Sequence, residues 1–287
     1  KKGELYAANY GQISSIGIDP IEKKPLYHFY PGQKILSLGT YGCNFSCEYC
    51  QNWRISQNEP ELREMTPAEV IEIALKRDVI GIAYTYSEPL VWYEFILKTS
   101  KLAADNDLKN VIVSNGFINQ KPLQELLPYL DAANIDLKSF NPDFYKKYCG
   151  GKLEPVLENI KLMYDKIHLE LTTLLITDIN DSEEELEDLF SWIEKIDPEI
   201  PLHLSRYFPN YNFDKEATPP QTMRKAYKLA KRHLNYVYLG NMRSAKGKDT
   251  ICPECGREVI KRTGYQTRVK LEDNHCPECG QKIAGYF

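Results

Sequence analysis

The sequence lacks any segment that would anchor or export it. No run of about eighteen apolar residues occurs in the 287 residues, and no charged segment followed by an apolar one stands at the start. We therefore expect neither a membrane span nor a secretory signal, and we expect the chain to be cytoplasmic. Residue 1 is lysine rather than methionine, so we expect the chain to be processed or cut from a longer one.

The sequence also lacks internal repeats, low-complexity tracts and a strong charge bias. Charged residues make up 26% and hydrophobic residues 43%, and the formal net charge is −4. This composition excludes a disordered or collagen-like chain and fits one large globular domain with a small appendage. The weak negative charge argues against a surface built mainly to follow nucleic-acid phosphates.

Short apolar runs alternate with amphipathic segments from Lys34 onward. The expected strands are Ile35–Leu38, Val79–Tyr84, Asn110–Ser114, Ala132–Leu137, Ile167–Ile176 and Leu202–Tyr207. The expected helices are about Pro67–Arg77, Leu90–Asp105, Pro122–Leu130, Glu154–Tyr164, Glu183–Ile196 and Pro220–Leu234. Capping boxes at Thr66 with Glu69 and at Ser182 with Glu185 mark two helix starts. Strict alternation of this kind implies parallel strands joined by right-handed crossovers.

Three of the later strands alternate between apolar and polar residues. Doubly wound sheets are covered by helices on both faces and read as nearly continuous apolar runs, so the alternation favours a barrel with a polar lumen. The alternative is that these polar residues only mark where strands meet solvent. The polar positions are Asn134, Asp136 and Lys138, then His168, Glu170 and Thr172, then His203 and Ser205.

The fold class that we predict is α/β, a partial (β/α)6 TIM-like barrel with a small C-terminal zinc-ribbon-like segment. The barrel is expected over residues 34–248. An N-terminal extension, 1–33, precedes it, and a four-cysteine module, 249–287, follows it.

Cysteine is scarce, with eight residues, and seven of them fall into tight groups. In a reducing compartment such groups indicate metal ligation rather than disulfides. The C-terminal pairs are two C-P-E-C-G knuckles, a spacing typical of a closed structural zinc site, with a rubredoxin-like iron site as the alternative. The eighth cysteine, Cys149, is expected to be a free thiol. The knuckle ligands are Cys252, Cys255, Cys276 and Cys279.

The remaining three cysteines form a C-x3-C-x2-C motif, Cys43, Cys47 and Cys50. Three thiolates can hold three irons of a [4Fe–4S] cluster and leave the fourth iron open, as catalytic metal sites do. The motif follows the first expected strand, and barrel enzymes keep their chemistry at the C-terminal ends of the strands. The motif therefore predicts a reactive iron–sulfur centre.

This motif, with Tyr49 before the third cysteine and a barrel around it, resembles the radical S-adenosylmethionine (radical SAM) superfamily. The chain is most similar to AmmeMemoRadiSam-system radical SAM enzymes, which are related to the pyruvate formate-lyase activating enzyme. The matching stretches, in order, are "DPIEKKPLYHFYPG", "CNFSCEYCQNWRISQ", "YTYSEP", "IDLK", "HLSRYFP", "YVYLGN" and the paired "CPECG" ending in "IAGYF".

The resemblance implies a role for each of a set of residues. The three cysteines would bind the cluster, and the amino and carboxylate groups of SAM would occupy the fourth iron. Tyr49 would pack by the adenine, and Glu88 would accept hydrogen bonds from the SAM amino group. The expected contacts to the methionine and ribose parts, and to the late-strand side of the site, are Ser114, Asn115, Asp136, Lys138, Thr172 and His203.

Each of these residues also has a plainer interpretation. Glu88 could cap the helix beginning near Pro89, "SNG" could be an ordinary turn, and Asp136 could simply pair with Lys138. His203 could be a satisfied interior histidine. His28 and Tyr30 are expected to pack rather than to ligate.

Two positions depart from the pattern of the activating enzymes. Tyr86, Ser87 and Glu88 replace their G-G-E motif, so only the acid is kept. Val113 stands where they carry an acidic ligand of a monovalent cation, which makes that cation doubtful in this chain.

The resemblance implies reductive cleavage of SAM to a 5′-deoxyadenosyl radical that abstracts hydrogen from a substrate, with a flavodoxin- or ferredoxin-like protein as reductant. The substrate could be a glycyl residue of a partner protein, another peptide or a small molecule. A different class of function is a non-enzymatic iron–sulfur electron carrier. A nucleic-acid-binding ribbon is a third alternative, supported only by the basic strip "KRTGYQTRVK".

Overall fold

The computed structural model describes residues 7–242 and 246–287. Its centre is an eight-stranded sheet in the order β10-β9-β8-β7-β6-β5-β3-β2. Seven of these strands run parallel, and β2 pairs antiparallel with β3 at one edge. The strands are β2 (Ser15–Pro20), β3 (Lys34–Gly39), β5 (Gly81–Tyr84), β6 (Lys109–Ser114), β7 (Ala132–Asp136), β8 (His168–Leu175), β9 (Leu202–Arg206) and β10 (Val237–Gly240).

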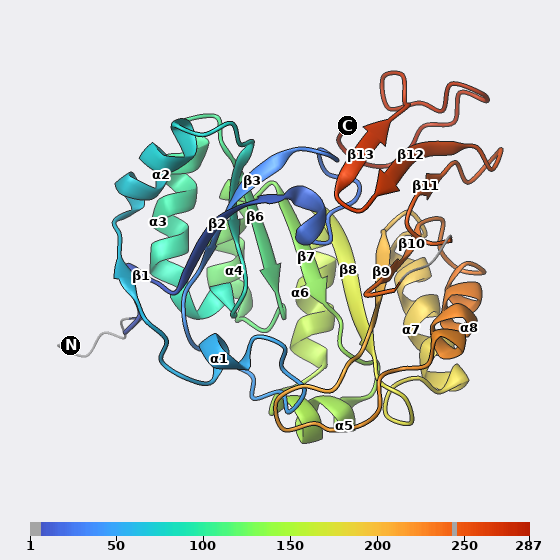
Figure 1. Cartoon of the computed structure of the whole chain (residues 1–287), viewed down its shortest axis with the longest axis horizontal. Helices are drawn as coiled ribbons and strands as arrows, with labels where there is room; N and C mark the ends of the chain where they lie inside the picture. Colours follow the sequence, from blue (N-terminus) through green and yellow to red (C-terminus); the bar gives the residue numbers. More distant parts are fainter. Residues whose placement is uncertain (1–6, 243–245) are drawn as a thin grey trace.

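Helices connect successive parallel strands and cover the outer face of the sheet, as Figure 1 shows. The longest, α7, has an apolar stripe of Leu186, Leu189, Phe190 and Ile193, all buried against the sheet. Both expected capping positions accept the N3 amide hydrogen, at Thr66 and at Ser182. The helices are α1 (Trp53–Ser56), α2 (Pro67–Leu75), α3 (Tyr93–Ala104), α4 (Gln120–Leu126), α5 (Pro142–Phe144), α6 (Glu154–Tyr164), α7 (Glu183–Ile196) and α8 (Pro220–Ala230).

The sequence prediction of an α/β fold with a mostly parallel sheet is confirmed, and all six expected strands are present within two residues at each end. Two strands of the sheet were missed. One is β10, which lies in "YVYLG". The other is β2, so the segment expected only as an extension before residue 34 supplies an edge strand to the central sheet.

The C-terminal module is a three-stranded antiparallel sheet of β11 (Thr250–Ile251), β12 (Glu258–Thr263) and β13 (Gln266–Val269). In Figure 1 it lies beyond β10, in red. It shares a small core with the barrel sheet, because Tyr236 and Tyr238 from around β10 pack with Val259, Ile260 and Ile283. A second two-stranded sheet joins β1 (Gln12–Ile13) to β4 (Arg63–Glu64).

The segment that follows β2 covers the inner, polar side of the later strands. Asn134 of β7 donates to the Pro25 carbonyl at 2.8 Å, and Glu170 of β8 accepts from the His28 amide at 2.7 Å. Tyr27 packs edge-on against His203 of β9. Part of the polar lumen expected from the alternation is therefore filled by this segment, which satisfies its buried polar groups.

No helix in the described part of the chain is long and apolar enough to span a bilayer.

Candidate functional site

One cavity of about 600 Å³ lies inside the curve of the sheet, at the C-terminal ends of the parallel strands. Residues from the ends of seven strands and from the loops that follow them line it, so the sheet must curve around a common space. Every residue expected at the cofactor site is on its wall. These residues are Cys43, Cys47, Tyr49, Cys50, Glu88, Ser114, Asn115, Asp136, Lys138, Thr172 and His203.

The loop after β3 carries the three cysteines and is held from both sides. The Gly42 amide donates to the Ile55 carbonyl at 2.8 Å, and the Ser46 amide donates to the Cys149 carbonyl at 2.9 Å. Phe45 occupies the space where a side chain on Gly151 would otherwise lie, 2.2 Å from the nearest ring atom. The loop is therefore fixed by contacts made 100 residues further along the chain.

The three thiols are a donor set that suits an iron–sulfur cluster, because thiolates from such a loop bind three irons. Burial raises the pKa of Cys43 to about 12, whereas a hydrogen bond with Cys149 lowers the pKa of Cys47 to about 7 in spite of burial. Bound metal would hold all three as thiolates.

Glu88 is buried at the cavity wall, where three groups of the chain donate to it. One carboxylate oxygen accepts from the Leu90 amide at 2.9 Å and the Ser114 hydroxyl at 2.7 Å, and the other accepts from the Asn115 amide at 2.8 Å. Burial raises its pKa to about 7, and these three donors only partly oppose the shift. The plainer interpretation of Glu88 is thus also correct, since it caps the short helix Pro89–Trp92.

The "SNG" turn after β6 is tied to the cysteine loop. Asn115 donates from Nδ2 to Asn44 at 2.7 Å and reaches the Cys43 sulfur at 3.8 Å. The Gly116 amide donates to the Ser114 hydroxyl, and Gly116 has a φ of +71°, a conformation that favours glycine. The turn is therefore both an ordinary turn and part of the cavity wall.

Asp136 and Lys138 form an ion pair at 2.9 Å at the end of β7, as one of the two interpretations expected. Burial alone would lower the pKa of Lys138, but Asp136 and the two thiols of Cys47 and Cys149 raise it well above its usual range. Lys138 is therefore a fixed positive charge beside the cysteine loop.

His203 lines the cavity through β9 and also contacts a carboxylate that sequence reasoning did not select. Glu170 is fully buried, and its two oxygens contact His203 Nε2 at 2.7 Å and His168 Nε2 at 3.0 Å. Burial opposes ionisation, but hydrogen bonds from both histidines hold the pKa of Glu170 well below its usual range. The sequence signal that could have selected Glu170 was its place among the alternating polar positions of β8.

Cys149 was expected to be a free thiol away from the metal centres. It forms no disulfide, but the fold places it against the cysteine loop, where its sulfur lies 3.2 Å from the Tyr49 hydroxyl. Tyr49 is buried among Phe144 and Phe213 while it lines the cavity. Tyr49 and Cys149 are 100 residues apart in the sequence, so no local pattern could predict this contact.

Another part of the cavity wall is built by the segment after β2, which sequence reasoning also missed. Asp19 accepts from Lys24 at 2.8 Å, Lys23 at 2.9 Å and the Tyr86 hydroxyl at 2.7 Å. Tyr86 has a φ of +73°, in the region that favours glycine, at the position where the resemblance leads one to expect glycine. Tyr265, at the tip of the β12–β13 hairpin, completes this wall beside Lys23.

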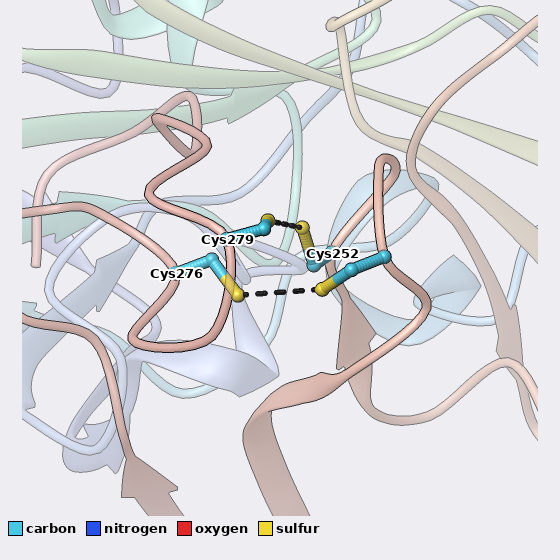
Figure 2. A group of neighbouring side chains, drawn as sticks. Cys252, Cys276 and Cys279 are labelled. Atoms are coloured by element: carbon cyan, nitrogen blue, oxygen red, sulfur yellow. Dashed lines mark hydrogen bonds between the residues drawn. The ribbon is translucent and has the colours of Figure 1, made fainter.

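The second candidate metal centre is the set of four cysteines in the C-terminal module. Their sulfurs all lie within 4.8 Å of one another, with Cys252 to Cys279 and Cys255 to Cys276 at 3.6 Å each. Figure 2 shows the two knuckles with their sulfurs turned towards each other. A tetrahedral ion with metal–sulfur bonds of about 2.3 Å separates its ligands by about 3.8 Å, so one ion fits between them.

Comparison with known proteins identifies the family to which the chain belongs. The family model described as the radical SAM superfamily matches residues 37–193, more than half of the chain. An uncharacterized protein of Methanocaldococcus jannaschii is 45% identical over 274 residues, which cover 93% of this chain and 81% of that protein.

Two further likenesses are more distant. The 4-hydroxyphenylacetate decarboxylase activating enzyme of Clostridium scatologenes is 27% identical over 52% of this chain, and the match covers about half of that enzyme, 53%. The solved structure of TYW1 with a lysine-pyruvate adduct bound superposes with a TM-score of 0.55 at 19% identity, covering 74% of this chain and 79% of that one. This second likeness concerns the fold alone.

Proposed function

The chain belongs to the radical SAM superfamily, and from this premise we propose that it cleaves SAM reductively inside the cavity and abstracts hydrogen from a substrate there. Membership implies a [4Fe–4S] cluster and SAM. When bound, these two cofactors supply a 5′-deoxyadenosyl radical after one-electron reduction. The curved, mostly parallel sheet around the cavity is, in this proposal, the partial barrel of the superfamily.

One observation carries the proposal. Eleven residues selected from the sequence, which span residues 43 to 203, converge on a single cavity, and three of them are cysteines of one loop. Cys43, Cys47 and Cys50 would hold three irons. The fourth iron would be left for SAM.

The other residues on the wall would bind and orient SAM. Glu88 would accept hydrogen bonds from the SAM amino group. Ser114 and Asn115 hold the Glu88 carboxylate oxygens in place. Asp136 and Lys138 lie on the ribose side, with Thr172 and His203 towards the late strands. Together they would exclude water and align the reactive carbon with one C–H bond of the substrate.

The direct test is SAM cleavage by the anaerobically reconstituted, dithionite-reduced protein. We expect 5′-deoxyadenosine from the native chain and none above background from Cys47→Ala, which removes one iron ligand. A native protein that binds a cluster but yields no 5′-deoxyadenosine would support the electron-carrier alternative instead.

For the substrate, we propose a glycyl residue of a partner protein as the first candidate. The support is the match to the activating enzyme of C. scatologenes, which spans only about half of that enzyme. The assay adds candidate partners carrying deuterium at the glycyl α-carbon. Deuterium in the 5′-deoxyadenosine identifies the partner.

A small molecule or another peptide is the second candidate, and the size of the cavity supports a small ligand. The segment from Asp19 to Tyr27 and the hairpin tip at Tyr265 also line the cavity. A volume of about 600 Å³, which SAM must share, is typical of a small-ligand site. Deuterium transfer from a labelled small molecule, with none from any protein partner, would decide for this candidate.

The electron would come from a flavodoxin- or ferredoxin-like protein, and we propose that the C-terminal module holds zinc. One zinc per chain by elemental analysis, with no iron absorbance from a cluster-free sample, supports zinc over a rubredoxin-like iron. A nucleic-acid role for the module predicts salt-sensitive binding to RNA or DNA, and absence of such binding excludes it.

A further inference from the structure

Two sulfurs of the cysteine loop each face one hydrogen-bonding side chain from outside the C-x3-C-x2-C motif. The Cys50 sulfur lies 3.2 Å from the Ser56 hydroxyl, at the end of α1. The Cys43 sulfur lies 3.8 Å from Asn115 Nδ2, in the turn after β6. Two different elements thus supply one partner for each of these two sulfurs.

The chemistry of a ligand thiolate fixes the direction of these bonds. A cysteine sulfur bound to iron has no hydrogen, so Ser56 must be the donor to Cys50. Ser56 accepts from Gln57 Nε2 at 3.5 Å, which leaves its own hydrogen for Cys50. Amide nitrogen of Asn115 can only donate.

Both Ser56 and Asn115 are buried, with exposed fractions of 6% and 5%. Water therefore competes little for these two donors, and in a low-dielectric site a hydrogen bond to an ionised acceptor is strong. A cluster with three thiolates carries a net charge of about −1 when oxidised and about −2 when reduced, so donors to sulfur stabilise the reduced form more.

We propose that Ser56 and Asn115 raise the reduction potential of the cluster by donating one hydrogen bond each to Cys50 and Cys43. The inference rests on the proposed function and deepens it. These are positioning residues, because they contact the ligands rather than SAM or the substrate through this interaction. Their effect is to bring reduction of the cluster within reach of a physiological reductant.

The test is an EPR-monitored redox titration of the full, reconstituted chain without substrate. Ser56→Ala should lower the midpoint potential, so that the ratio of reduced to oxidised cluster at a fixed potential falls about fivefold, the weight of one ordinary hydrogen bond. Ser56→Thr, which keeps a donor, should return towards the native value. Iron and sulfide content per chain confirms equal loading.

Ser46→Ala is the matched control, because Ser46 is exposed in the same loop and its hydroxyl has no contact with a cysteine sulfur among the described residues. Equal potentials for native, Ser56→Ala and Ser46→Ala proteins at equal loading overturn the proposal. If the potentials are equal but the native chain still takes up a cluster and cleaves SAM, this inference fails and the proposed function stands. If the native chain does not cleave SAM, the proposed function itself fails.

Discussion

At the scale of single residues, two buried carboxylates are shifted in opposite directions by what surrounds them. Glu88 accepts hydrogen bonds from two backbone amides and a hydroxyl. Because these donors are neutral dipoles, they only partly offset the loss of hydration, and burial raises the pKa of Glu88 to about 7. Glu170 accepts hydrogen bonds from the two imidazoles of His168 and His203, and these bonds hold its pKa low in spite of burial. Glu88 is therefore poised for a cationic ligand, whereas Glu170 is already paired.

The first prediction concerns pH and SAM affinity. The free Glu88 carboxyl is protonated as the pH falls below about 7, and only the carboxylate accepts hydrogen bonds from the SAM amino group with both oxygens. SAM binding should weaken about tenfold between pH 8 and pH 6, since one pKa unit is a factor of ten. Equilibrium binding of SAM to the oxidised cluster protein measures this. Glu88→Gln should bind weakly at both values, and a slope that persists in Glu88→Gln would contradict the assignment.

The second prediction concerns Glu170 and stability. Glu170→Ala removes the shared partner of His203, His168 and the His28 amide, and breaking a buried pair of this kind costs about 3–5 kcal/mol. Because the folded pKa of Glu170 is depressed, its contribution is present above the usual carboxyl pKa and is lost as the pH falls further. Denaturant unfolding of Glu170→Ala and native protein at pH 7 and at pH 4 should show the difference shrinking at pH 4.

Glu187→Ala is the control for this comparison. Glu187 also contacts a histidine, His233, at 2.9 Å, but its side chain is 48% exposed. An exposed pair contributes about 0–1 kcal/mol, so this substitution should have little effect. Equal losses in the two variants would show that burial of Glu170 is not the cause.

At the scale of elements, the cysteine loop depends on the segment Tyr145–Gly151. The carbonyls of Tyr148 and Cys149 accept from the Glu48 and Ser46 amides, and the segment ends with Gly150 at a φ of +68°. The π-helical turn and the two glycines that follow it thus support the cysteine loop. Nothing in the spacing of residues 145–151 predicts that this segment contacts the cysteine loop.

The third prediction tests that support. Gly151→Ala places a Cβ 2.2 Å from the Phe45 ring, so the ring and the cysteine loop must move. We expect the variant to retain less than half of the native iron after reconstitution while remaining folded. Gly17→Ala is the control, because its added Cβ meets only the Tyr86 hydroxyl at 3.9 Å. Full iron content in Gly151→Ala would show that the loop tolerates the displacement.

At the scale of the whole molecule, the C-terminal module and the segment after β2 are one unit with the barrel sheet. Arg262 of β12 lies over the Tyr27 ring at 4.2 Å and donates to the Tyr27 carbonyl at 2.7 Å. Thr267 of β13 donates to Glu22 at 2.6 Å. Through these contacts the module supports the part of the cavity wall that the segment after β2 forms.

The fourth prediction follows from this arrangement. Cys252→Ser with Cys276→Ser should abolish metal binding by the module, and thermal unfolding should begin at a lower temperature, because the module has little apolar core without an ion. Elemental analysis and calorimetry measure the two effects. The iron of the loop after β3 should be unchanged, and its loss as well would mean that the two centres are coupled.

The sequence by itself determined most of the elements and predicted the ligand sets, because both depend on local patterns of residues. Alternating apolar runs and capping boxes located six strands and their helices, and the spacing of cysteines separated an open triplet from a closed set of four. The residues expected at the cofactor site line one cavity, although their individual contacts with SAM stay predictions.

Only the tertiary structure decided what long-range packing brings together. The strand β2, the carboxylate of Glu170, the thiol of Cys149 beside Cys47 and the wall formed by Asp19, Lys24 and Tyr86 all depend on pairings between segments far apart in the chain. Local periodicity carries no information on such pairings, since each depends on how the sheet curves and which loops then meet.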